Sequence, residues 1–368
     1  MIIFALNINN KSRMQKVSFN NKNSDFFNTL KGKVDSYFKS NNIKETGNYK
    51  LYIKTALLSL SLIALYTILV FFTPNVWIAL GLCLLLGINL AAIGFNVMHD
   101  GAHGSFSTKT WVNEMMGYSL NVMGGSVYLW KYKHNVNHHS FTNIEGMDED
   151  IDIKPWIRVH ADQKKHWYHR FQHVYWAILY CTTYLLWIFV QDFKKYFTGK
   201  IGELPFRKMD AKEHVIFWVS KVAYIGVFLV LPIFMVGLVE TIIGYSVIAA
   251  ICGFVIAIVF QLAHIVEDAN FEAPTNDNHK VEAEWAVHQI QTTANFATKS
   301  KIVSWFTGGL NYQVEHHLFP RISHVHYPKI SELVRETCQQ FGVTYIEFPT
   351  VLSAVRSHVV HLRHVGRS

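Results

Sequence analysis

Cysteine is scarce in this 368-residue chain, and its cysteines are widely spaced. The four are Cys83, Cys181, Cys252 and Cys338. None lies in a Cys-x-x-Cys pair and three lie in apolar runs, which argues against a zinc ribbon or a disulfide framework. We expect reduced thiols that pack among apolar side chains.

Charged residues are also scarce. Asp, Glu, Lys and Arg make up 16% of the chain, whereas 50% of its residues are hydrophobic. At this length, a positive mean hydropathy favours membrane spans over a large soluble core. The formal net charge of +8 is expected on the cytoplasmic face, beside anionic lipid. No soluble domain carries a basic cluster, so we expect no nucleic-acid partner.

The first 50 residues lack the signature of a cleavable signal peptide, since no short basic segment precedes an apolar run and a small-residue site. Lysines are instead scattered among asparagines and serines. The composition predicts a polar cytoplasmic segment over residues 1–50, a membrane domain over residues 51–345 and a cytoplasmic tail over residues 346–368.

Four apolar runs are long enough to cross a membrane: residues 55–72, 76–98, 222–239 and 242–263. A short connector without Lys or Arg joins the members of each pair. Because basic residues stay on the cytoplasmic side, both connectors are predicted to be external. The outer ends of the two hairpins are then cytoplasmic.

Histidine, in contrast, is abundant, with 20 residues. His99 and His103 are four residues apart, which places both imidazoles on one face of a helix. His134 and His138 repeat that spacing, and His139 is turned about 100° around the helix. These spacings are typical of metal ligands carried on helices.

A third cluster, Gln313, His316 and His317, has the i, i+3, i+4 spacing of one helical face. His264 ends the last apolar run at the same expected membrane depth as His99, where an ionisable group is a functional candidate. Acidic residues inside two clusters, Asp100 and Glu315, are possible supports for the ligands.

Nine candidate ligands exceed what one ion takes, so the count predicts a site for two metal ions. An imidazole-rich set without thiolate suits iron, zinc, copper or nickel. Bis-histidine haem is a rival, but the interiors of the apolar runs contain no histidine. A membrane metal transporter is a second alternative, although its polar ligands would lie along a path through the spans.

A fifth apolar run, residues 174–190, is close to the lower length limit for a span. A single crossing there would place the third histidine cluster on the opposite side from the other two. We therefore predict an interfacial helix for this run. The expected fold is an all-α integral membrane protein with four transmembrane helices in two hairpins, interfacial helices and a cytoplasmic helical cap that holds a two-metal site.

The three clusters resemble the histidine boxes of the integral-membrane fatty acid desaturase family, over residues 50–345. The boxes read His99-Asp-Gly-Ala-His103, His134-x-x-x-His138-His139 and Gln313-x-x-His316-His317. Their flanks agree: His139-Ser-Phe-Thr-Asn143 precedes an acidic run, and the third box lies within Asn311-Tyr-Gln-Val-Glu-His-His-Leu-Phe-Pro320. The glutamine that opens the third box is similar to that of the front-end branch.

The resemblance implies a fatty acyl desaturase that uses O2, electrons and two iron ions. It would insert a cis double bond into an acyl chain that already carries one. Alternatives on the same scaffold are a di-iron lipid hydroxylase and a sphingolipid desaturase. The implied catalytic residues are His99, His103, His134, His138, His139, His316 and His317, and the implied metal ligands add His264 and Gln313.

Many front-end desaturases carry a fused cytochrome b5 domain with a His-Pro-Gly-Gly motif, which this sequence lacks. The departure implies a separate electron donor, cytochrome b5 or a ferredoxin, as in the stand-alone bacterial members. The other implied partners are membrane lipid and a fatty acyl substrate on CoA, a carrier protein or a lipid. The expected location is a bacterial cytoplasmic membrane rather than the endoplasmic reticulum.

The histidines outside the boxes are expected to have other roles. Those between residues 160 and 173 lie among basic residues just before the 174–190 run. We interpret that segment as a basic amphipathic surface for lipid headgroups or an acyl carrier. His358, His361 and His364 are expected to be solvated or locally hydrogen-bonded.

Overall fold

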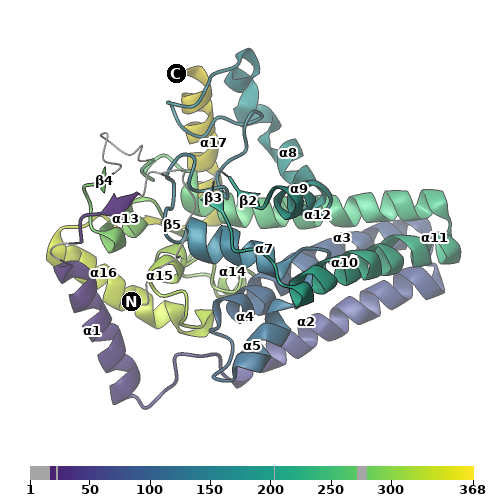
Figure 1. Cartoon of the computed structure of the whole chain (residues 1–368), viewed down its shortest axis with the longest axis horizontal. Helices are drawn as coiled ribbons and strands as arrows, with labels where there is room; N and C mark the ends of the chain where they lie inside the picture. The colour runs from purple at the N-terminus through teal and green to yellow at the C-terminus, as the bar shows by residue number, and fades with distance from the viewer. Residues whose placement is uncertain (1–16, 22–23, 203, 272–279) are drawn as a thin grey trace.

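Helices dominate the computed structural model, which describes residues 17–21, 24–202, 204–271 and 280–368. Figure 1 shows long helices that run side by side to the right, and shorter helices gathered around their inner ends to the left. The predicted helical class is therefore confirmed, and so is the presence of helices suited to a membrane.

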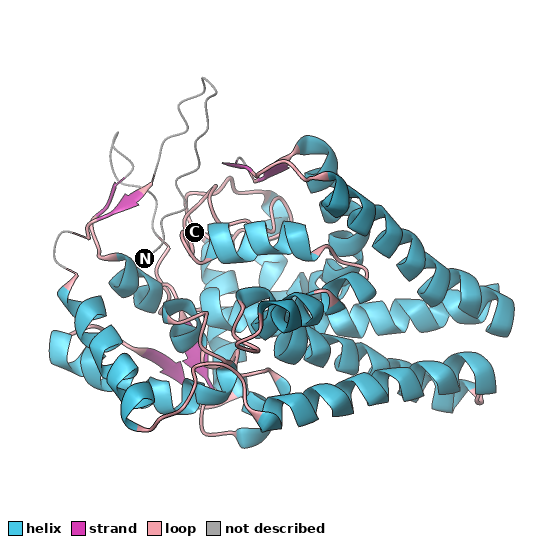
Figure 2. Cartoon of the chain, turned by 60° about the horizontal axis from the view of Figure 1, so that its bottom comes forward, coloured by secondary structure: helices cyan, strands magenta, loops and turns pink. Residues whose placement is uncertain are grey.

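The strands are short and pair two by two (Figure 2). Two of the three pairs join segments that are distant in sequence, and none forms a core sheet in the described part of the chain. The sequence did not predict them, because strands of two or three residues leave no alternating apolar pattern. The pairs are β1 (Ser18–Phe19) with β4 (Lys280–Val281), β2 (Lys200–Ile201) with β3 (Leu204–Pro205), and β5 (Ala294–Phe296) with β6 (Ile346–Phe348).

The first long hairpin follows the two apolar runs predicted between residues 55 and 98. Asparagines cap both helices, since Asn48 accepts a hydrogen bond from the Lys50 amide and Asn75 accepts one from the Trp77 amide. The second helix runs on into the first histidine box, so a membrane-compatible helix carries these ligand candidates. The hairpin consists of α2 (Tyr49–Thr67), η1 (Ile68–Phe72), α3 (Val76–Ile93), η2 (Gly94–Met98) and α4 (His99–His103).

The second hairpin begins at Ala211, well before the predicted start at residue 222. Charged side chains in this first part had masked it. One of them, Lys221, is buried and donates to Asp192 at 2.8 Å and to two backbone carbonyls, so its charge is paired inside the protein. Gly237, with a φ of 106°, turns the chain. The hairpin consists of α10 (Ala211–Ile225), η6 (Gly226–Val230), α11 (Leu231–Val236) and α12 (Leu238–His264).

A further long helix lies between the hairpins and covers the run predicted to be interfacial. It spans Trp167–Thr198 and, by length and composition, is one of five helices suited to cross a membrane, rather than four. In Figure 1, its α8 part runs across the direction shared by α2, α3, α10 and α12. Its parts are η4 (Trp167–Phe171), α8 (Gln172–Leu186), η5 (Trp187–Gln191) and α9 (Asp192–Thr198).

Gly253 allows α8 and α12 to approach closely. A Cβ atom here would lie 2.9 Å from the backbone nitrogen of Tyr184 and 3.0 Å from the backbone oxygen of Tyr180. Neither backbone atom can rotate away, so Gly253→Val is expected to lower the free energy of unfolding by about 1–3 kcal/mol. Thermal unfolding in detergent measures the effect. The matched control is Gly244→Val on the same helix, whose nearest neighbour is the Cys83 sulfur at 3.4 Å, and equal losses at both sites would contradict this account.

Shorter helices form a cap around the inner ends of the long ones. α1 (Asp25–Ser40) packs against α16 (Tyr327–Phe341) through an apolar core that includes Leu30, Val34 and Val334. This places part of the N-terminal segment against the C-terminal half of the chain. The other cap helices are α5 (Thr110–Gly117), α6 (Ser119–Val122), α7 (Val127–Lys131), η3 (Tyr132–His138), α13 (Trp285–Gln291), α14 (Lys301–Phe306), α15 (Gln313–Leu318) and η7 (His324–His326).

The segment predicted as a C-terminal tail is packed into the fold. β6 pairs with β5, and α17 (Val351–Arg367) packs against α8 and α12. His358 is fully buried there, where its Nδ1 donates to the Ile265 carbonyl at 2.6 Å and its Nε2 accepts from the Tyr180 hydroxyl at 2.9 Å. These partners are distant in sequence, so the solvated or local role predicted for His358 is wrong, whereas His364 is exposed as expected.

Acid is expected to loosen α17 through His358. Burial lowers the pKa of His358 to about 4, below its ordinary value of 6.5. Because the folded-state pKa is the lower one, the stabilisation is complete above about pH 6.5 and is lost as the pH falls toward 4. The loss reaches about 2 kcal/mol at pH 5. Limited proteolysis of the C-terminus across this range measures it, and a pH response that persists in His358→Gln would contradict the assignment.

Candidate metal centre

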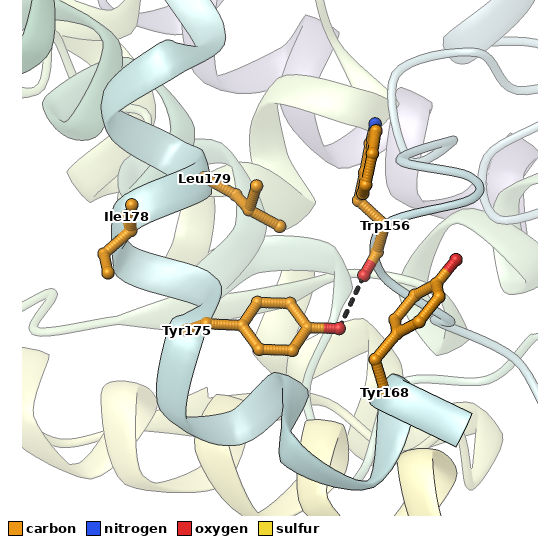
Figure 3. Close-up of a pocket in the computed structure, with 5 residues that line it drawn as sticks. All are labelled: Trp156, Tyr168, Tyr175, Ile178 and Leu179. Carbon is orange, nitrogen blue, oxygen red and sulfur yellow. Dashed lines mark hydrogen bonds between the residues drawn. The ribbon is translucent and has the colours of Figure 1, made fainter. Parts of the chain in front are cut away.

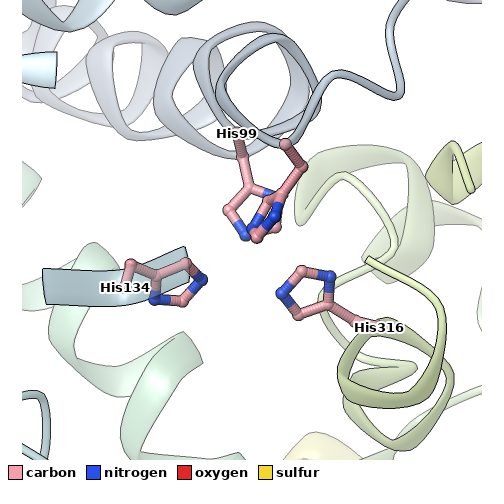
Figure 4. Close-up of side chains that lie close together, drawn as sticks. His99, His134 and His316 are labelled. Atoms are coloured by element: carbon pink, nitrogen blue, oxygen red, sulfur yellow. The ribbon is translucent and has the colours of Figure 1, made fainter. Parts of the chain in front are cut away.

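Four imidazoles from three elements meet at the inner end of the first hairpin. His99 and His103 come from α4, His134 from η3 and His316 from α15, and each offers a nitrogen within 4.8 Å of the others. The ring centroids of His99 and His316 are 4.4 Å apart. In Figure 4, the labelled rings of His99, His134 and His316 point toward a common space. We call these four residues the first histidine group.

Three further imidazoles form a second histidine group: His138, His264 and His317. Their ring centroids are 4.8–4.9 Å apart in all three pairs. His264 lies at the inner end of α12, so the two long hairpins each deliver ligand candidates to the same place. The structure thus brings His264 to the boxes, as the sequence predicted.

His139 lies between the two groups. Its ring centroid is 4.5 Å from that of His316 and 4.5 Å from that of His317. Gln313 begins the same helix as these two histidines, and its side-chain oxygen is buried without a hydrogen-bond partner in the described part of the chain. All eight predicted histidines therefore gather in one cluster, with Gln313 on the helix that carries two of them.

A π-helical segment, η3, lets the second box serve both groups. The His139 amide donates to the His134 carbonyl, five residues back, which is π-helical bonding. The α-helical spacing predicts that His134 and His138 share one face. The two rings do lie together, stacked with centroids 5.1 Å apart, yet His134 also joins the first group and His138 the second. A single π turn leaves no periodic signal in the sequence, so the pattern could not assign these rings.

Two carboxylates of one short acidic segment, Asp148–Asp150, orient a ring in each group. The Nδ1 of His138 donates to Asp148 at 2.8 Å, and the Nδ1 of His134 donates to Asp150 at 3.0 Å. Asp150 also pairs with the Lys133 ammonium. Each carboxylate fixes the proton on Nδ1, so the Nε2 of each ring is left as a lone-pair donor.

The third box is supported in the same way by other elements. The Nδ1 of His317 donates to the Gln289 side-chain oxygen at 2.8 Å, and the Nδ1 of His316 lies 3.1 Å from the Tyr327 hydroxyl. His264 reaches a backbone carbonyl through Nδ1 at 3.3 Å. In His264, His316 and His317, the Nδ1 is bonded to protein, whereas the Nε2 has no hydrogen-bond partner in the described residues.

Most of the nitrogens on the other side of these rings have no hydrogen-bond partner in the described residues, whereas the Nε2 of His134 lies 3.3 Å from the Nε2 of His139. An unpartnered buried polar atom is costly, yet many lie within one cluster here. Since neutral imidazoles suit first-row transition metals, the residues fit a bound cation of this kind. The unpartnered atoms are the Nε2 of His103, His138, His264, His316 and His317, the Nδ1 of His139 and the Oε1 of Gln313.

Burial favours the neutral, metal-binding form of most rings in the cap. Desolvation, followed by the neighbouring imidazoles, lowers the pKa of His139, His316 and His317 well below the usual range. His138 differs. Burial opposes its protonation, but the Asp148 and Asp150 carboxylates together outweigh burial and raise the pKa of His138.

The acidic residues inside the boxes face away from the cluster. Asp100 accepts from the His324 ring at 3.0 Å. Glu315 accepts from Asn295 at 2.7 Å and from Tyr345 at 2.9 Å, and burial raises the pKa of Glu315 to about 7. The sequence suggested that Asp100 and Glu315 support the ligands. The side chains that bond the imidazoles are instead those of the acidic segment, Gln289 and Tyr327. Only the acidic run after the second box offered a sequence signal for these supports.

The fatty acid desaturase family matches residues 75–349 of this chain. That stretch contains every histidine of both groups. The chain belongs to the fatty acid desaturase family. The resemblance read from the three boxes is thereby confirmed, and the buried imidazole cluster of this desaturase scaffold suggests a metal site.

Named relatives of this desaturase agree with the family match. It is 40% identical over 349 residues to an acyl-lipid (8-3)-desaturase of Physcomitrium patens, covering 94% of this chain and 72% of the relative. It is 37% identical over 369 residues to an sn-1 linoleoyl-lipid 6-desaturase of Arthrospira platensis, covering 96% of each. A Synechocystis relative with the same name is 34% identical, with 96% and 99% covered. The protein is therefore a membrane fatty acyl desaturase of the front-end type, as predicted.

Proposed function

We propose that the two histidine groups of this desaturase hold two iron ions and activate O2. The convergence of unpartnered buried nitrogens from all three boxes carries this proposal. Iron is preferred to zinc because desaturation is a redox reaction. One iron is assigned to His99, His103, His134 and His316, the other to His138, His264 and His317, with His139 between them and Gln313 as a further ligand.

The chemistry requires a redox metal. A methylene C–H bond has no acidic proton and no leaving group, so side chains alone cannot break it. When bound, two irons with one O2 and two electrons supply an oxidant that removes two hydrogens from adjacent carbons. With two protons taken up, both oxygen atoms leave as water. The residues of this chain hold the metals, orient the imidazoles and exclude water, since His138, His316 and His317 are fully buried.

The proposed substrate is an acyl chain carried on a membrane lipid and already unsaturated. The names of the relatives support this, because they are acyl-lipid and linoleoyl-lipid desaturases. The new cis double bond would form between the existing one and the carboxyl end. A narrow apolar tunnel beside the metals would select the position. The electrons would come from a separate donor, cytochrome b5 or a ferredoxin.

Product analysis tests this function. The chain is expressed in a host that lacks the activity and is fed defined polyunsaturated precursors. The expected product carries one more double bond, on the carboxyl side of the existing bonds, and appears in glycerolipids before the acyl-CoA pool. A hydroxy fatty acid would instead indicate the hydroxylase alternative. A bond on the methyl side would contradict the front-end assignment.

The proposed topology has two membrane hairpins, with both termini and the metal centre on the cytoplasmic side. Its support is that α4 and the end of α12 meet at one end of the long helices (Figure 1). A crossing by α8 would separate the third box from the first two, so α8 is assigned to the interface. The proposed divisions are residues 1–50, 51–345 and 346–368, the last packed against the membrane domain rather than free of it, in a bacterial cytoplasmic membrane.

Gln313→His tests whether position 313 is a ligand position. Its oxygen is buried and unpartnered, and an imidazole offers a stronger donor on the same helical face. We expect the variant to retain both irons and to hold them at least as tightly against a chelator. Iron content by mass spectrometry measures this. Loss of all iron would show that position 313 has a different role, and Gln340→His, on the exposed end of α16, is the matched control.

A further inference from the structure

The first turns of the helix that contains α8 expose a stripe of large apolar side chains. Trp167 is 76% exposed, Val174 68% and Ile178 71%, and Phe171 is exposed between them. These residues are three or four positions apart, so they lie on one side of the helix. A soluble surface rarely carries such a stripe, and an amphipathic helix in the plane of a membrane interface does.

Basic residues lie on the same segment as this stripe and on the neighbouring helix α17. Residues 163–191 contain no Asp or Glu, and neither does α17. The two elements are adjacent, because the Lys165 ammonium donates to the Arg367 backbone carbonyl at 2.6 Å. Charge of one sign on a segment that also exposes Trp and Phe matches an anionic lipid surface. The exposed basic residues are Lys164, Lys165, Arg170, Arg356, Arg363 and Arg367.

An apolar pocket opens beside the stripe (Figure 3). Its volume is about 280 Å³, and it is lined by Trp156, Tyr168, Tyr175, Ile178 and Leu179. The Tyr175 hydroxyl donates to the Trp156 carbonyl at 2.8 Å, which fixes two of the aromatic walls. Ile178 belongs to both the stripe and the pocket, so the two features form one continuous surface.

We propose that this surface, the α8–α17 basic face, rests on the membrane and binds anionic phospholipid. Its apolar stripe and pocket contact acyl chains and glycerol, and its Lys and Arg side chains contact phosphate. An acidic protein, such as an electron donor, would match the charges alone. Such a partner would leave the exposed apolar stripe unexplained. Binding here places α8 along the membrane surface. The lipid composition around the enzyme then affects how the cap is positioned on the membrane.

Photo-crosslinking tests the contact directly. Benzoylphenylalanine replaces Trp167 in the full-length chain, which is placed in nanodiscs of phosphatidylcholine with added phosphatidylglycerol. We expect lipid adducts in which phosphatidylglycerol exceeds its share of the disc. The same probe at Phe341, on α16 in the cap, should give none. Absence of lipid adducts at position 167, or adducts to an added ferredoxin in their place, would overturn the proposal.

A charge variant tests the preference for anionic lipid. Lys164→Gln, Arg170→Gln and Arg363→Gln together should reduce the enrichment of phosphatidylglycerol by about fivefold for each charge removed, up to its complete loss. The matched control removes three exposed lysines from α1 and α16: Lys31, Lys39 and Lys329. Equal enrichment in both variants would overturn the anionic-lipid assignment. These readouts need no turnover, so they are independent of whether the proposed reaction is correct.

Discussion

His316→Ala is expected to abolish desaturation and to leave the protein with one bound iron instead of two. The residue is fully buried, and its Nε2 is unpartnered in the first histidine group. The variant removes one of the four histidines proposed to bind that iron. His317→Ala should have the same effect through the second group, although the two residues are neighbours on α15. A loss of more than about 100-fold in product formation is expected for each variant, exceeding the usual effect of losing a supporting residue.

Two measurements on the same preparations decide this prediction: iron per chain by mass spectrometry, and product formed from a defined acyl-lipid. His364→Ala is the matched control, because that histidine is exposed at the end of α17. It should keep both irons and full activity. Retention of two irons in either His316→Ala or His317→Ala would show that the variant residue is not a ligand.

Asp148→Asn and Asp150→Asn are expected to weaken iron binding by about 10–100-fold each, without touching a ligand. The amide keeps the size of the carboxylate but loses its charge and no longer enforces the proton on Nδ1 of His138 or His134. Because the two aspartates support different groups, each variant should weaken mainly one of the two irons. Stepwise removal of iron by a chelator, followed over time, measures both affinities.

Glu149→Gln is the matched control for this pair. Glu149 lies between the two aspartates but pairs with the Lys195 ammonium at 2.9 Å rather than with an imidazole. It should lower stability slightly and leave both irons in place. If Glu149→Gln released iron as readily as Asp148→Asn, the effect would come from disorder of the segment. The orienting role of the aspartates would then be wrong.

The sequence located histidines that gather in one cluster, because its boxes have helical spacing. His99 with His103, and His316 with His317, lie on real helices, so the pattern located them. Two features of the site could not be predicted from the sequence. The π-helical η3 lets His134 reach one histidine group and the neighbouring His138 the other, and Gln289 comes from a segment whose sequence has no ligand pattern. Both depend on how separate elements meet, which spacing along the chain does not encode.

The long helices show the same limit. Apolar runs located both hairpins, but the start of α10 was missed because Lys221 appears polar in sequence and is paired with Asp192 in the fold. His358 was assigned a local role because nothing in sequence connects it to Ile265 and Tyr180. Local composition identified the elements, whereas buried polar pairs between distant elements required the structure.

The most direct test of the central claim is the Mössbauer spectrum of the purified desaturase loaded with iron-57. We expect two iron signals of equal area and different environment, because the two histidine groups differ in number and in supporting residues. Both signals should change together on exposure to O2 with reductant and substrate. A single iron signal at one iron per chain would contradict the two-metal assignment, and so would full activity with zinc in place of iron.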